Sequence, residues 1–328
     1  MDFGNNGLAK ANLHVANGQK MLAGGDRESV GAGFTDSGFC KQEGNVDNSI
    51  SVVIPVHNRL SEVKRAVRSV LSQTYAASEI LIVENNSDDP AEIKSVIAEF
   101  ESDKIVFYSL LCCENANVAR NFGAEEASGR FIAFLDSDDE WDEDHLENCM
   151  RVIKVYNCDF VYGAARVYNG IESEIKCSRN IYEDEEPIDF LLGKNRGYAQ
   201  TSSFLISKEI WDQNRWDESL KRHQDLDFFC RVVSNVPSAC NKNSDYTIHW
   251  LKGEVRDFDF ESVKRFYLNN RAAMGLFSEV RYLMIMIVSC LRAKRFKCVL
   301  FFICAALKLP DKCLSKLCYK KEFTTRVG

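Results

Sequence analysis

The stretch Phe134-Leu135-Asp136-Ser137-Asp138-Asp139 decides the fold class of this chain. Its three carboxylates follow the apolar run Arg130–Leu135, which predicts a buried strand, because strands of a parallel sheet are apolar on both faces. Ligands of open α/β sheets bind outside the carboxyl ends of such strands. Carboxylates there offer hard oxygen ligands to Mg²⁺ or Mn²⁺, and such a cation can neutralise a diphosphate. By itself, however, an Asp-x-Asp pair is more often a solvated turn.

Strands and helices alternate around this stretch. Apolar and β-branched runs predict strands at Ile50–Val56, Glu79–Val83 and Lys104–Ser109, and helical spacing predicts a helix after each of them. Such alternation with short turns predicts a parallel, doubly wound α/β sheet. Further along the chain the pattern is looser. It predicts a helix at Asp144–Tyr156, strands at Phe160–Val167 and Ser202–Ile206, and helices at Leu226–Ser234 and Phe260–Met274.

Four polar segments fall at or near the carboxyl ends of the predicted strands, and each alone is typical of a turn. They are residues 53–59, 82–89, 117–123 and 136–139. Together they would surround one crevice with a carboxylate, an arginine and a metal-binding triplet. The chain has neither a Gly-x-Gly-x-x-Gly nor a Walker sequence after its first strand, so phosphate charge would fall to the metal. Asp225, far downstream, is the first residue of an amphipathic run. Acidic residues at such a position are most often helix caps, and we interpret Asp227 as one of these.

The order and spacing of these motifs resemble glycosyltransferase family 2, inverting nucleotide-sugar transferases of the GT-A fold. The resemblance covers residues 49–254 and rests on residues 53–59, 119–123, 134–141, 200–203, 216–218 and 223–228. It implies a GT-A α/β domain, a Rossmann-like sandwich, over residues 49–254. A disordered extension would precede it at 1–48, and a helical, basic region that could associate with a membrane would follow at 255–328.

The resemblance also implies a role for each matching residue. Asp138 would bind the metal, Mn²⁺ or Mg²⁺, and Asp225 would be the general base. The nucleotide sugar would contact Pro55, His57, Asn58, Glu84, Arg120 and Asp136. Thr201, Ser202 and Trp216 would face the acceptor, although packing or turn roles fit them equally. His249 would approach the metal, or else lie on a strand surface. The segment Glu84-Asn85-Asn86-Ser87 departs from the family's Asp-Asp-Gly-Ser, which puts a direct role for Asn85 in doubt.

The implied function is the inverting transfer of a hexosyl or N-acetylhexosaminyl group. The donor would be a nucleotide-diphosphate sugar, a UDP-sugar, and the acceptor a hydroxyl of a glycan or lipid-linked molecule in cell-surface polysaccharide synthesis. One alternative is a nucleotidyltransferase, but such an enzyme would require a Gly-rich N-terminal loop with a basic residue, which the sequence lacks. The other is a catalytically inactive subunit that binds sugar nucleotides, against which the presence of both Asp138 and Asp225 argues.

The charge of the chain is divided unevenly. Residues 281–328 contain eleven Lys or Arg and two Asp or Glu, a net charge of +9. Since the whole chain has a net charge of −7, the other residues together carry −16. An acidic body argues against nucleic-acid binding, whereas a basic apolar tail suits an anionic membrane. Two apolar blocks, Tyr282–Leu291 and Val299–Leu307, are each too short to span a bilayer. We therefore expect a cytoplasmic protein peripheral to the inner membrane face, or a hairpin packed on the domain. The 13 scattered cysteines predict reduced core thiols.

Overall fold

The computed structural model describes residues 48–110, 115–250 and 258–309, which belong to one compact unit. The predicted extension at 1–48, apart from its last residue, lies outside them, as do the predicted boundary at Glu254 and the end of the tail. The described strands are β1 (Ile50–Val56), β2 (Glu79–Asn85), β3 (Ile105–Leu110), β4 (Phe131–Phe134), β5 (Glu140–Trp141), β6 (Phe160–Gly163), β7 (Ala165–Tyr168), β8 (Ser173–Lys176), β9 (Leu205–Ser207), β10 (Ser238–Asn241) and β11 (Tyr246–His249). The described helices are α1 (Leu60–Leu71), α2 (Pro90–Ala98), α3 (Ala116–Glu126), α4 (His145–Tyr156), α5 (Pro187–Leu192), the 3₁₀ turn η1 (Thr201–Ser203), α6 (Lys208–Gln213), α7 (Gln224–Val233), α8 (Phe260–Asn270), α9 (Leu276–Arg292) and α10 (Phe296–Leu307).

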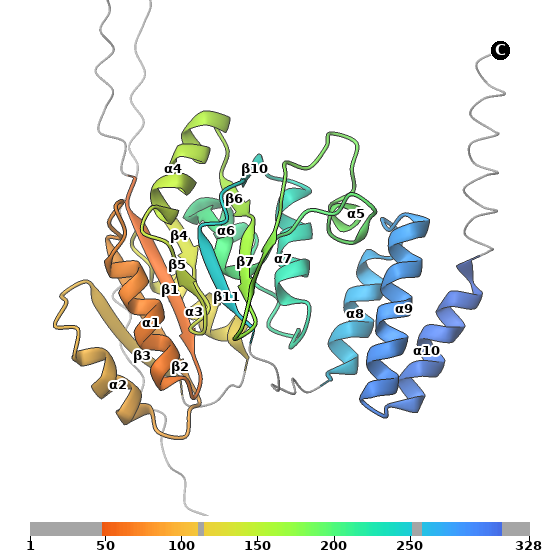
Figure 1. Cartoon of the computed structure of the whole chain (residues 1–328), viewed down its shortest axis with the longest axis horizontal. Helices are drawn as coiled ribbons and strands as arrows, with labels where there is room; N and C mark the ends of the chain where they lie inside the picture. Colours follow the sequence, from red (N-terminus) through yellow and green to blue (C-terminus); the bar gives the residue numbers. More distant parts are fainter. Residues whose placement is uncertain (1–47, 111–114, 251–257, 310–328) are drawn as a thin grey trace, which may run out of the picture. The chain divides into compact units, whose positions relative to one another are not determined.

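The main sheet has seven strands in the order β10-β6-β9-β4-β1-β2-β3 (Figure 1). β1 runs parallel to both β2 and β4, and β2 runs parallel to β3, which confirms the prediction for the first half of the sheet. β9 is antiparallel to both of its neighbours, so the sheet is mixed. The predicted strand at Ser202–Ile206 was wrong in its first residues, because η1 turns the chain there before β9 begins.

Alternate residues of the central strands enter two cores. Val52 and Ile54 of β1 pack in the core that includes α1, α2 and α4, while Val53 packs in the core that includes α3 and α7. Burial on both faces explains why these strands are continuous apolar runs. Helix α3 lies close to the sheet at Gly123, where a Cβ atom would be 2.5 Å from Cγ1 of Val53. A glycine is therefore needed at this place in the Ala-Arg-Asn-Phe-Gly motif.

A second sheet has four strands in the order β5-β11-β7-β8. The continuous strand predicted at Phe160–Val167 is divided at Ala164, so that β6 belongs to the main sheet and β7 to the small one. Where β6 ends, Gly163 lies against the backbone of Asn241, and the N–H of Ala164 donates to the same carbonyl over 3.1 Å. The chain changes sheets at this contact. The small sheet brings β11 beside the Asp136–Glu140 segment.

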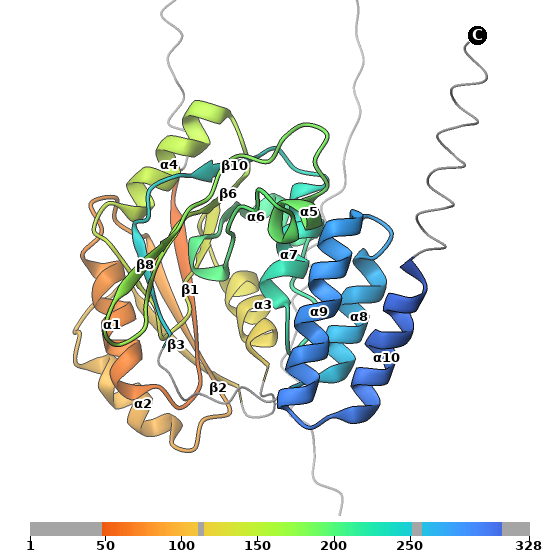
Figure 2. The ribbon, with the colours of Figure 1, turned by 45° about the vertical axis from the view of Figure 1, so that its right-hand side comes forward.

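The C-terminal helices form a layer beside the second core (Figure 2). α9 and α10 form a hairpin, and α9 also packs against α5. Tyr282 of α9 donates to the carbonyl of Val263 in α8 over 3.1 Å, and Tyr267 donates to the fully buried Glu279 over 2.8 Å. One face of the hairpin is thus packed on the protein, as the alternative interpretation of the tail predicted. None of the helices within the described ranges is both long enough and apolar enough to cross a membrane.

Candidate active site

The loops after β1, β2 and β4 meet at one edge of the main sheet. Val56 is the register partner of Glu84, so β1 and β2 end at nearly the same level, and Val53 is that of Phe134, so β4 ends three residues earlier at the same edge. Asn58, with φ of 51°, donates its N–H to Ser87 over 3.0 Å and accepts from the N–H of Asp88 over 2.8 Å. The next residue, Arg59, reaches Asp138 with Nη1 3.2 Å from Oδ2. The loop after β1 therefore links the other two.

Glu84, predicted to contact the nucleotide, is turned into the protein. It is fully buried, and its carboxylate accepts from the N–H of Ser87 over 2.6 Å and from the hydroxyl of Ser109. Its extra methylene compared with aspartate is what lets it reach both partners. In this conformation Glu84 shapes the loop after β2 and does not present its charge to the crevice.

The neighbouring Asn85 offers a polar atom that sequence reasoning undervalued. It is 3% exposed, and its amide donates to the carbonyl of Asn115 over 3.0 Å. Its Oδ1 is buried and has no hydrogen-bond partner among the residues described. An unpaired buried acceptor is costly, so this position fits a ligand donor such as a base N–H. The exposed His57 ring stands at the same edge, with Nδ1 donating to the carbonyl of Asn85 over 2.9 Å, whereas Pro55 is buried within β1.

Arg120 of α3 is a buried connector. Its Nη2 donates to Asp136 over 2.6 Å, and its Nη1 donates to Asn117 over 2.9 Å and to Gln224 over 3.2 Å. The guanidinium also lies 4.8 Å from the ring centre of Trp216, a favourable cation–π distance. Because these contacts occupy it, Arg120 orients Asp136 and the start of α7, and it is not free to clasp a diphosphate in this conformation.

The three aspartates after β4 lie in different surroundings. The side chains of Asp136 and Asp138 are 22% and 19% exposed, whereas Asp139 is 2% exposed and accepts from the hydroxyl of Ser202 over 2.6 Å. Burial, together with the charges of Asp138 and Asp136, raises the pKa of Asp139 well above its usual range. Asp139 therefore belongs to the supporting structure, and the two other carboxylates face the crevice.

The donor atoms at this edge fit a hard cation that is shared with phosphate. In the part of the chain that the structure covers, no three His, Cys, Asp or Glu side chains form a closed metal cage. Mg²⁺ does not require one, since it usually takes one or two carboxylates plus waters and substrate phosphates. Asp138 and Asp136 could supply such carboxylates. The imidazole of His249 donates instead to Glu140 over 2.8 Å, beside this cluster.

Asp225 lies in the first turn of α7, which begins after His223 in a left-handed conformation with φ of 58°. Its carboxylate accepts from the N–H of Leu226 over 3.0 Å. Burial is the main cause that raises the pKa of Asp225; Asp136 raises it further, and Arg120 lowers it. Arg120 contacts both Asp136 and Gln224, the residue before Asp225. One hydrogen-bond network therefore joins the aspartates at the predicted metal site to the predicted base.

A cavity of about 560 Å³ opens beside Asp225. Its walls come from β8, the loop before η1, the start of α7 and the end of β11, and they include Lys176, Arg196, Tyr198 and Trp250. Of the predicted site residues, only Asp225 lines it. Thr201, Ser202 and Trp216 are each at most 2% exposed, so they support the site from within, and direct contact with an acceptor stays a prediction.

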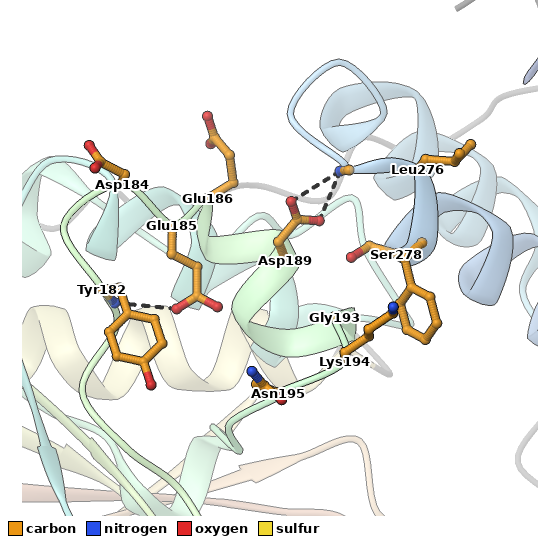
Figure 3. Close-up of a pocket in the computed structure, with 12 residues that line it drawn as sticks. Tyr182, Asp184, Glu185, Glu186, Asp189, Gly193, Lys194, Asn195, Leu276 and Ser278 are labelled. Atoms are coloured by element: carbon orange, nitrogen blue, oxygen red, sulfur yellow. Dashed lines mark hydrogen bonds between the residues drawn. The ribbon is translucent and has the colours of Figure 1, made fainter. Parts of the chain in front are cut away.

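A second cavity, also of about 560 Å³, lies between α5 and α9 (Figure 3). Asp189 projects across it, accepting from the N–H of Gly275 over 2.8 Å, and Lys194 lies over the ring of Phe277. None of the predicted site residues lines this cavity. Its polar groups fasten α5 to the C-terminal helices.

The chain was compared with known proteins. The model of glycosyl transferase family 2 matches residues 51–213. The Escherichia coli "UDP-Glc:alpha-D-GlcNAc-diphosphoundecaprenol beta-1,3-glucosyltransferase WfgD" is 36% identical over 123 residues, 38% of this chain and 48% of that protein. The Erwinia amylovora "Amylovoran biosynthesis glycosyltransferase AmsB" is 28% identical over 195 residues, 57% of this chain and 64% of that protein. The chain thus spans less than two thirds of either relative.

Among solved structures, S. aureus TarS 1-349 in complex with UDP is similar, with a TM-score of 0.53. The match covers 76% of this chain and 89% of that chain at 14% identity, which speaks for the fold alone. The predicted GT-A fold is thereby confirmed, with its helical C-terminal extension. From its motifs, its sheet and the match to residues 51–213, the chain belongs to glycosyl transferase family 2.

Proposed function

We propose that the protein transfers a hexosyl or N-acetylhexosaminyl group from a UDP-sugar to a hydroxyl of a glycan or lipid-linked acceptor, with inversion. The observation that carries the proposal is the network Asp136–Arg120–Gln224, which places the carboxylates of the sheet edge in electrostatic contact with Asp225. The names of the relatives support the substrate classes: one uses UDP-Glc and a diphosphoundecaprenol acceptor, and another serves amylovoran biosynthesis. We place the protein in cell-surface polysaccharide synthesis.

In the proposed reaction, Asp225 takes the proton of the acceptor hydroxyl as its oxygen attacks the anomeric carbon. The bond from that carbon to the diphosphate breaks on the opposite side, so the anomeric centre inverts and the nucleoside diphosphate leaves. A bound Mn²⁺ or Mg²⁺ would supply charge neutralisation for the leaving diphosphate, held by Asp138 with Asp136 beside it. The raised pKa of Asp225 suits a base, because a carboxylate that is less stable as an anion accepts a proton more readily.

On the donor side, the exposed groups are the best candidates for direct contact. His57 and Asn58 stand at the end of β1, and Asn85 provides the unpaired acceptor behind them. Arg59 faces Asp138, so it can also approach a diphosphate. We assign Glu84 and Arg120 to positioning: the former holds the loop after β2, and the latter holds Asp136 and the start of α7.

We also propose that the protein is peripheral to the inner face of the cell membrane. The support is a stripe of exposed apolar side chains along α9 and α10, flanked by basic residues. The stripe consists of Leu276, Val280, Met284, Val288 and Leu291 on α9, and Phe296, Leu300, Ile303 and Leu307 on α10. Its members recur every three or four residues, which places them along one side of each helix. Such a surface suits a helix pair that lies in the bilayer interface.

The test is a panel of nucleotide sugars incubated with the purified protein and Mn²⁺. The expected result is slow hydrolysis of one UDP-sugar, and transfer once a diphosphate-linked lipid acceptor is added. Chelation of the metal should stop both reactions. Donor binding without hydrolysis or transfer across the panel would instead favour the inactive sugar-nucleotide-binding subunit, and release of pyrophosphate from a nucleoside triphosphate would favour a nucleotidyltransferase.

A further inference from the structure

The cavity beside Asp225 is lined by an arginine whose charge is not paired with a described carboxylate. Arg196 is exposed and lines the cavity together with Asp225. No hydrogen bond or ion pair joins it to any other described residue. The second cation of the cavity, Lys176, is paired with Glu174 over 2.5 Å. Among the described residues that line the cavity, Arg196 is therefore the cation that is available to a ligand.

The backbone that carries Arg196 is held on both sides. On one side, Arg179 donates to the carbonyl of Asn195, from Nη2 over 2.7 Å and from Nε over 3.1 Å. On the other side, the N–H of Gly197 donates to the carbonyl of Phe190 over 2.8 Å, and a Cβ at Gly197 would run into the Phe190 ring. A fixed backbone limits where the guanidinium can reach, so less entropy is lost when an anion binds than if Arg196 stood on a mobile loop.

The loop is also fastened to the segment that follows β8. The hydroxyl of Ser178 donates to the carbonyl of Tyr198 over 2.6 Å and accepts from its N–H over 3.2 Å. Lys176, two residues before Ser178, and Arg196, two residues before Tyr198, thus stand on two segments that are bonded to each other. Both segments line the same cavity as Asp225.

Apart from Glu174, which pairs with Lys176, the remaining walls of the cavity are mostly apolar, and two of their side chains are well exposed. Trp250 is 65% exposed and Ile175 is 58% exposed, and Leu226 follows Asp225. An aromatic side chain gives a platform for the C–H faces of a sugar, and a guanidinium can bind a phosphate through two parallel hydrogen bonds. The Asp225 carboxylate would repel a phosphate, so the phosphate belongs at the Arg196 end and the hydroxyl at the Asp225 end.

From this arrangement we infer that Arg196 binds a phosphate group that the acceptor carries next to the sugar whose hydroxyl is attacked. The inference rests on the proposed function, in which Asp225 deprotonates that hydroxyl. It makes Arg196 a specificity-determining residue that selects phosphate-bearing acceptors over neutral glycans. The phosphate could be the diphosphate of a lipid-linked sugar or a phosphodiester within a polymer.

The test is direct binding, measured by titration calorimetry without donor. The probes are N-acetylglucosamine 1-diphosphate carrying a short alkyl chain, the corresponding alkyl phosphodiester, and the phosphate-free alkyl glycoside. We expect Arg196→Gln to weaken binding of the diphosphate probe about 10- to 100-fold, the usual worth of a charge-assisted hydrogen bond, and to leave the phosphate-free probe unchanged. Lys194→Gln removes an exposed cation that lines the other cavity, and it should change neither. Glu174→Gln, which frees Lys176, should tighten binding of the diphosphate probe.

Tighter binding of the diphosphate than of the phosphodiester identifies a lipid-linked diphosphate as the source, and the reverse order identifies a polymer. Unchanged binding of both phosphate probes by Arg196→Gln would overturn the inference, as would an equal loss for all three probes, which would show a merely structural role. Failure of the proposed function is recognised separately, because wild-type protein would then process no nucleotide sugar whatever Arg196 binds.

Discussion

Arg120 Nη2 lies 2.6 Å from Asp136 Oδ1, and this ion pair joins α3 to the loop after β4. The same guanidinium reaches Gln224, the first residue of α7, over 3.2 Å. Three elements that are far apart in the sequence are therefore fixed to one another by a single buried side chain. The Arg120 side chain thereby helps to fix the position of Asp136 relative to Asp225.

Replacing Arg120 by methionine should destabilise the protein by about 3 kcal/mol. The substitution keeps an unbranched apolar stem but removes the guanidinium, which leaves the carboxylate of Asp136 and the side-chain oxygen of Gln224 without this partner, and breaking a largely buried ion pair is costly. Urea denaturation measures the change. Arg215→Met is the matched control, because Arg215 pairs with a Glu125 side chain that is 58% exposed, and it should cost about 1 kcal/mol or less. Equal losses in the two variants would contradict the connecting role of Arg120.

The strands β1, β2 and β4 could be predicted because they are buried on both faces and therefore appear as continuous apolar runs. The small sheet could not be predicted in this way. β8 is exposed along its length, and β5 has only two residues, so both exist through their pairing partners. The antiparallel strand β9 likewise follows the turn η1, which no periodic pattern in the sequence predicts.

The positions of the site residues along the chain were easier to predict than their surroundings. The carboxylates of Asp136 and Asp138 lie at the sheet edge where the run Arg130–Leu135 predicted them. Glu84 also lies at its predicted strand end, but it is turned inward because Ser109 is its register partner on β3. Such a contact depends on strand pairing, which the local sequence does not specify.

Asp138→Ala should abolish metal-dependent donor binding and leave the fold intact. The substitution removes the carboxylate proposed to hold the cation, whereas the side chain is partly exposed and belongs to neither hydrophobic core. Calorimetric titration of a UDP-sugar with and without Mn²⁺ measures the effect, and thermal unfolding reports on the fold. Asp144→Ala, an exposed aspartate without a side-chain cap bond, is the control and should bind as wild type. Undiminished metal-dependent affinity in Asp138→Ala would refute the assignment.

Asp225→Asn should keep donor affinity and lose transfer by roughly 10²- to 10⁴-fold, the usual contribution of a general base. The amide preserves the shape of the side chain and can still accept from the N–H of Leu226, but it cannot take a proton. Transfer to a saturating acceptor is the measurement, and Asp227→Asn is the control, because Asp227 is engaged by Arg231 over 2.8 Å. Transfer by Asp225→Asn at nearly the wild-type rate would mean that another group is the base.

The pH dependence of transfer should reflect the pKa of Asp225, which depends on the residues around it. The base acts in its ionised form, so the rate falls as the pH drops through the pKa of this carboxyl. Burial raises that pKa, with Asp136 adding to the increase, so the acid limb should lie above the range of an ordinary aspartate. Asp136→Asn should move the limb to lower pH, and Arg120→Met should move it to higher pH, since Arg120 lowers this pKa. Burial, together with the charge of Asp225, raises the pKa of Tyr198, so its phenol stays neutral throughout. A limb that neither variant moves would exclude Asp225 as its source.

The last prediction concerns the apolar stripe of α9 and α10, whose occupant we propose to be an anionic membrane. Between residues 276 and 309 the charged side chains are six Lys or Arg and one Glu, and that Glu279 is fully buried. A symmetric dimer through the stripe would bring two sets of these cations together, whereas anionic headgroups would neutralise them.

Replacing Met284, Leu300 and Leu307 by serine should abolish flotation with phosphatidylglycerol vesicles. These side chains are 62%, 62% and 73% exposed, so the substitution spares the packed face and the fold. Each buried apolar side chain is worth roughly 1.5–3 kcal/mol, and each basic residue near the surface about 1 kcal/mol, so loss of three apolar side chains removes a contribution comparable with that of all six cations. The control replaces Val155, Tyr156 and Ile171, which are also exposed but lie outside the C-terminal helices, and should float as wild type. Rising salt should weaken flotation of the wild type. If the serine variant floats unchanged, the stripe is not the membrane surface, and if it instead loses a lipid-independent dimer, the stripe is covered by a second copy of the chain.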